Sequence, residues 1–160
     1  MTGFELQREE GLSRGARAVV IYPDRRKGGS RDVESRLAEA AGLAQAIGID
    51  VVDRAATHVR APKASTLFGS GQIEAITARL RAHDAELLIV DGSLTPVQQR
   101  NLETETKSKV IDRTGLILEI FGERAASAEG RLQVELAHLD YQAGRLVRSW
   151  THLERQRGGF

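Results

Sequence analysis

The apolar run RAVVIY at residues 17–22, closed by Pro23, decides the fold class of this chain. Its length and its β-branched side chains favour a buried strand. A basic, glycine-containing loop follows, and Gly48 is well placed to end the helix beyond it. The apolar residues between loop and glycine recur on one helical face: Val33, Leu37, Ala40, Ala41, Ala44 and Ile47. The chain therefore begins with a strand followed by a helix.

The same alternation continues along the chain. We expect further strands at residues 49–55, 87–90 and 109–111. One intervening helix opens at Gly69-Ser70-Gly71, after a loop over residues 59–69, and another is capped by Ser93 or Thr95 with Pro96 in its first turn. Strands that alternate with helices predict an α/β fold: a four-stranded, mostly parallel sheet with helices on both faces, in strand order 2-1-3-4.

The pattern changes after Asp112. Residues 116–121 suggest a short apolar helix, and a narrow leucine seam then recurs at spacings of four and three, at Leu132, Leu136, Leu139, Ala143, Leu146, Trp150 and Leu153. This spacing is typical of a coiled coil, whose seam needs a partner helix. We divide the chain into a flexible tail (1–16), an α/β domain (17–114) and a helical arm (115–160).

Composition bounds the function. The 160 residues are 41% hydrophobic and 28% charged, with a net charge of +1, which is typical of a soluble globular protein. The absence of cysteine excludes disulfides, cysteine zinc sites and thiol catalysis. No run approaches the roughly 20 apolar residues of a membrane span, and the first ten residues lack an apolar signal core, so we expect a cytoplasmic protein.

Several short features admit a functional and a structural interpretation. Gly69-Ser70-Gly71 could hold a phosphate at a helix start, but a tight turn explains two glycines as well and is favoured. Asp91 and Asp112 each follow a strand and could hold magnesium, whereas helix capping and turn formation are favoured. A basic loop could touch phosphates, although a solvated surface loop is favoured: Arg25, Arg26, Lys27 and Arg31.

Other chemistry finds little support. The four histidines, His58, His83, His138 and His152, show no spacing typical of metal ligands, so we expect no metal site. The Gly-x-Ser-x-Gly motif of a serine nucleophile is also missing. We expect no catalytic residue in this chain.

The strongest functional candidate is the end of the arm. Within thirteen residues stand Arg145, Arg148, Trp150, His152, Arg155 and Arg157, opposed by one carboxylate, that of Glu154. Arginine binds phosphate in a bidentate manner, and arginine or aromatic rings stack on splayed RNA bases. The residue types are equally consistent with a solvated coiled-coil face.

Three stretches are distinctive: STLFGSGQIE at residues 65–74, DGSLTPVQQRNLE at 91–103, and VIDRTGLILEIF at 110–121, the last followed by EGRLQVEL at 129–136. These stretches resemble the HflX family of ribosome-binding GTPases. The segment WTHLERQRGG at 150–159 is similar to the family as well. The strings occur in the family's order over most of residues 60–160.

The resemblance implies an α/β N-terminal domain, then a helical hairpin, then a GTPase domain that lies outside this chain. It implies binding to ribosomal RNA of the large subunit through the arginine-rich end of the arm, and ribosome splitting or rescue under stress. The chain has no Gly-x-x-x-x-Gly-Lys-Ser/Thr string, so GTP and Mg²⁺ are expected only for the GTPase domain. Two alternatives stay open: ATP binding at Gly69–Gly71, and self-association through the open leucine seam.

Overall fold

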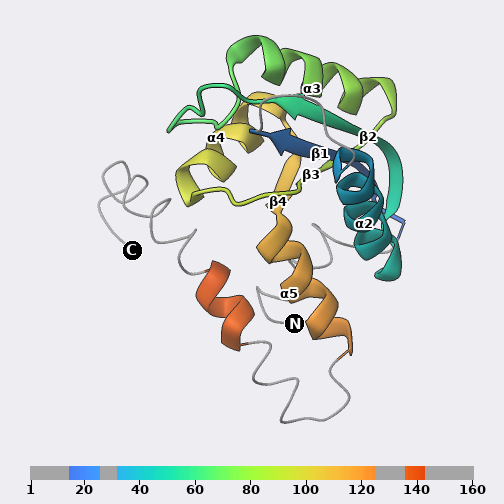
Figure 1. The fold of residues 1–160 in the computed structure, drawn as a ribbon. Coiled ribbons are helices and arrows are strands. Elements are labelled where there is room, and N and C mark those ends of the chain that lie inside the picture. The colour runs from blue at the N-terminus through green and yellow to red at the C-terminus, as the bar shows by residue number, and fades with distance from the viewer. Residues whose placement is uncertain (1–14, 26–31, 125–135, 143–160) are drawn as a thin grey trace.

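The computed structural model describes residues 15–25, 32–124 and 136–142. Its centre is a sheet of four strands: β1 (Arg17–Asp24), β2 (Asp50–His58), β3 (Leu87–Val90) and β4 (Lys109–Asp112). Every pair is parallel and the order is β2-β1-β3-β4 (Figure 1). The predicted α/β class, parallel sheet and strand order are confirmed.

Two helices cover each face of the sheet. On one side lie α3 (Ser70–Ala82) and α4 (Pro96–Thr106), and on the other α2 (Asp32–Ala46) and α5 (Arg113–Arg124). Strand β1 contributes side chains to the core on both faces of the sheet. Val19 and Ile21 pack on the side of α3 and α4, and Ala18 and Val20 pack on the side of α2 and α5. A central strand buried on both faces reads as a continuous apolar run rather than an alternating one.

Strand β2 is longer than the sequence predicts and ends at His58 instead of residue 55. The reason is tertiary: β1 continues through Pro23 to Asp24, and these two residues pair with Thr57 and His58. Pairing with a long neighbour extends a strand whose own residues carry little apolar signal. A register shift between Ala18 and Val19 leaves Val52 as an extra residue, which makes a bulge in this edge strand.

The predicted helix ends agree with the local chemistry. Gly48 has φ +82° immediately beyond α2, a backbone conformation that favours glycine. Thr95 caps α4: its hydroxyl accepts a hydrogen bond from the Gln98 amide at 3.1 Å, and the Gln98 side chain accepts one from the Thr95 amide at 2.9 Å. Pro96 follows in the first turn.

Helix α5 contributes Leu116 and Ile120 to the core, and helical residues 136–142 lie beside it (Figure 1). Two residues of the leucine seam fall among these described helical residues, Leu136 and Leu139, and their exposed fractions are 54% and 45%. The remaining seam residues lie outside the described ranges, and the domain boundary at residue 115 stays a prediction. No helix within the described ranges is both long and apolar enough to cross a membrane.

Candidate functional site

Three carboxylates gather where the strands end. Asp24 ends β1, Asp112 ends β4 and Asp91 directly follows β3, and each is buried. The chain returns from β2 across β1 to reach β3, so the order of the strands reverses between β1 and β3. In open α/β sheets, ligands bind outside the carboxyl ends of the strands at such a reversal. This edge is therefore the first place to search for a site.

Arg113 of this chain neutralises part of the negative charge at this edge of the sheet by binding two carboxylates. Its guanidinium donates to Asp91 Oδ1 at 2.8 Å and to Glu39 Oε1 at 2.5 Å. The hydrogen bond to Glu39, then that to Asp91, holds the pKa of Arg113 above its ordinary value. Asp91 Oδ2 is buried without a hydrogen-bond partner. The described residues contain no group of three or more histidine or acidic side chains arranged to hold a metal ion.

Asp112 caps α5, as the favoured interpretation of the sequence predicts. Its Oδ1 accepts a hydrogen bond from the Gly115 amide at 3.0 Å, three residues along the chain. Its Oδ2 accepts one from the Leu94 amide at 3.1 Å, which ties the loop after β3 to the end of β4. The carboxylate thus holds two backbone amides in place.

The Gly69–Gly71 turn sits at the start of α3, as predicted. Gln72 satisfies part of the turn: its side-chain oxygen accepts from the Gly69 amide at 3.0 Å, and its nitrogen donates to the His58 carbonyl at 2.5 Å. A Cβ on Gly71 would meet nothing within 4 Å. The adjacent hollow is lined by Ser70 together with two carboxylates, those of Glu74 and Glu105, which oppose an incoming phosphate.

Two of the stretches that carry the resemblance meet in the fold. Asn101 donates to the Ser65 carbonyl at 2.9 Å, and Gln98 donates to the Lys63 carbonyl at 2.9 Å. These bonds hold the loop before α3 against α4, with Leu67 and Phe68 fully buried beneath it. Leu67 has φ +67°, an uncommon conformation for a bulky residue, which its burial in the core maintains. Much of this resemblance therefore reflects packing.

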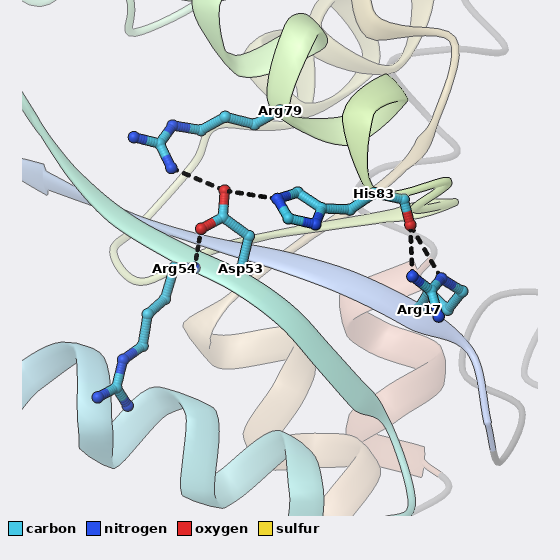
Figure 2. Close-up of polar contacts among 5 residues, drawn as sticks. All are labelled: Arg17, Asp53, Arg54, Arg79 and His83. Atoms are coloured by element: carbon cyan, nitrogen blue, oxygen red, sulfur yellow. Dashed lines mark hydrogen bonds and ion pairs between the residues drawn. The ribbon is translucent and has the colours of Figure 1, made fainter.

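The structure also contains a polar cluster at the edge strand β2 that no sequence pattern predicts. The bulge at Val52 aims Asp53 at α3, where the carboxylate meets Arg79 at 2.7 Å and His83 Nε2 at 3.7 Å (Figure 2). Arg17 donates two hydrogen bonds to the His83 carbonyl, at 2.7 and 2.9 Å. Asp53 is mostly covered while its partners are half-exposed. The cluster fastens α3 to the open edge of the sheet.

Two polar contacts join α5 and its capping residue Asp112 to helical residues 136–142, and no sequence pattern predicts them. The Tyr141 hydroxyl donates to Asp112 Oδ1 at 2.7 Å. Farther along α5, Glu119 pairs with His138, and both side chains are buried. The other predicted site residues lie mostly outside the described ranges: of the basic loop only Arg25 is described, and none of the six arginine, tryptophan and histidine side chains at the end of the arm is.

Comparison with known proteins identifies the family. Residues 34–122 match the family described as GTP-binding GTPase N-terminal, and residues 124–160 match the GTP-binding GTPase middle region. GTPase HflX of Magnetococcus marinus is 50% identical over 131 residues, which are 81% of this chain and 30% of that protein. GTPase HflX of Chlamydia pneumoniae is 42% identical over 157 residues, 98% of this chain and 33% of that protein.

Solved structures share the fold. A GTP-binding protein from Sulfolobus solfataricus in complex with GDP superposes with a TM-score of 0.62 at 22% identity, over 88% of this chain and 42% of that one. The chain spans about a third of the length of the curated relatives it matches. With the α/β architecture, the ordered strings and the matched regions in agreement, the chain belongs to the HflX family of GTPases and carries that family's N-terminal region.

Proposed function

We propose that this chain is the ribosome-binding module of an HflX-type GTPase. In this proposal the α/β domain and the arm dock on RNA of the large ribosomal subunit, in the cytoplasm, as part of a protein that splits or rescues ribosomes under stress. One observation carries it: in a chain of this family, the arginine-rich stretch at residues 145–157 begins three positions beyond helical residues 136–142, which polar contacts fasten to the domain.

The chemistry of that segment suits RNA. Four arginines provide forked donors for phosphate oxygens, and Trp150 and His152 offer rings on which an unpaired base can stack. The seam supports the same assignment, because Leu136 and Leu139 are about half exposed and offer apolar surface to a second helix. GTP and Mg²⁺ belong in this proposal to the GTPase domain of the whole protein.

Cosedimentation with purified large ribosomal subunits tests the proposal. We expect salt-sensitive binding, weakened strongly when four arginines are replaced together by alanine: Arg145, Arg148, Arg155 and Arg157. Phosphate contacts release counterions, so each lost contact should also flatten the dependence on salt.

A matched control removes an equal number of positive charges by replacing four exposed residues of the domain with alanine: Arg36, Arg60, Lys63 and Lys107. Equal loss of binding in both variants would show that net charge alone is responsible. Unchanged binding in the first variant would overturn the assignment of the arm. The alternative of ATP binding at Gly69–Gly71 would be rejected by a titration with labelled ATP that shows no saturation.

A further inference from the structure

Helical residues 136–142 contact the domain through polar side chains. His138 is 3% exposed against α5, whereas Leu136 and Leu139 are about half exposed. An apolar helix that docked only to bury surface would turn its leucines inward. Here directional hydrogen bonds determine which side of the helix faces the domain.

The contacts fix the direction of the helix as well as its rotation. His138 meets Glu119, and Tyr141 meets Asp112 and Gly115, so the two helices run antiparallel where they touch. A Cβ on Gly115 would lie 3.0 Å from the Tyr141 hydroxyl and 3.3 Å from its Cζ. The tyrosine ring therefore packs directly on the glycine, and a Cβ at this position would require the ring to shift by a few tenths of an ångström.

The chemistry of these contacts differs from that of the leucine seam. An imidazole–carboxylate contact and a hydroxyl–carboxylate hydrogen bond require a particular distance and angle, while apolar contacts tolerate sliding. Both carboxylates are buried, that of Asp112 at the end of β4 and that of Glu119 on α5, and Asp112 is itself held by the Leu94 and Gly115 amides. The contacts of Tyr141 with Asp112 and of His138 with Glu119 therefore hold helical residues 136–142 in a defined position relative to the edge of the sheet.

We propose that Tyr141 and His138 are positioning residues: through Asp112 and Glu119 they set the direction in which the arm leaves the α/β domain. The inference rests on the proposed function in one respect, that the arm so directed carries the RNA-binding segment. It predicts that the arm loses its fixed direction, while the domain stays folded, when these contacts are removed.

The absence of cysteine in the chain makes the test direct. Spin labels at A78C on α3 and A137C on the arm, both exposed alanines, report the distance between the two parts by pulsed electron resonance. We expect one narrow distance distribution for the unsubstituted chain and broad ones for Tyr141→Phe and for His138→Gln. The reversed pair, Glu119→His with His138→Glu, should restore the narrow distribution.

Two further measurements separate positioning from folding and from function. The urea midpoint followed by circular dichroism should stay unchanged in Tyr141→Phe, and Tyr22→Phe, which removes the other tyrosine hydroxyl, should alter nothing. Binding to large ribosomal subunits should weaken about tenfold in Tyr141→Phe, the factor expected when the net stabilisation of one hydrogen bond is lost.

A narrow distribution that survives both substitutions would overturn the proposal. Broad distributions with unchanged subunit binding would overturn its second part, that the arm so directed carries the RNA-binding segment. If the unsubstituted chain fails to bind subunits, the proposed function falls, and the distance measurement still decides whether these residues direct the arm.

Discussion

Replacing Asp112 by alanine should destabilise the α/β domain more than any surface change. The carboxylate is 2% exposed and accepts hydrogen bonds from two buried backbone amides, those of Leu94 and Gly115. Alanine keeps the backbone but provides no acceptor, and a closed site of this kind gives water little room to replace it. The substitution therefore leaves two amides unsatisfied in the core.

The size of the effect follows from those two bonds. Loss of the cap on α5, through the Gly115 amide, should cost about 1 kcal/mol. The Leu94 amide, buried between two strand ends, should add about 2 kcal/mol as an unsatisfied donor. We therefore expect the free energy of unfolding to fall by about 3 kcal/mol, a large share of the roughly 5–15 kcal/mol typical of a domain.

Urea denaturation followed by circular dichroism measures this difference. Asp50→Ala is the matched control, because Asp50 is a strand aspartate whose side chain is 58% exposed and 3.7 Å from Arg17. Its loss should lower the stability by at most about 1 kcal/mol. A loss in Asp112→Ala no larger than in the control, with an unchanged denaturant slope, would refute the role given to this carboxylate.

Two further substitutions follow from the same contacts. Gly115→Ala should leave the α/β domain as stable or up to about 1 kcal/mol more stable, since alanine favours a helix. Hydrogen exchange at residues 136–142 should accelerate, because the new Cβ crowds the Tyr141 ring and forces it to shift; unchanged exchange would contradict the close packing of the ring on Gly115. Glu103 has its pKa raised from 4.5, first by burial, against the opposing hydrogen bond from the Val110 amide and the charge of Lys109. Between its unfolded and folded pKa the folded state binds more protons, so stability should fall as the pH rises just above 4.5. Glu103→Gln should abolish that fall in urea titrations, and a fall that persists would assign it to another group.

The sequence predicts those parts of the fold and of the candidate site that depend on residues close together along the chain. The strands at 87–90 and 109–112 and the helix capped by Thr95 depend on neighbours within a few residues, so apolar runs and turn residues suffice to predict them. The extension of β2 to His58 depends on its pairing with β1 and carries no local signal. The capping role of Asp112 is predictable because aspartate commonly caps helices and forms turns, and the amide that it accepts from, that of Gly115, lies only three residues along the chain.

By itself the sequence determined the α/β class, the parallel sheet, the family and the apolar seam of the arm. Only the tertiary structure decided that Arg113 bridges Asp91 and Glu39, the latter 74 residues away, and that Tyr141 rests on Asp112 and Gly115. The physical reason is that backbone propensity and apolar periodicity act along the chain. Which side chains of different elements meet is set instead by strand order and by the rotation of each helix on the sheet.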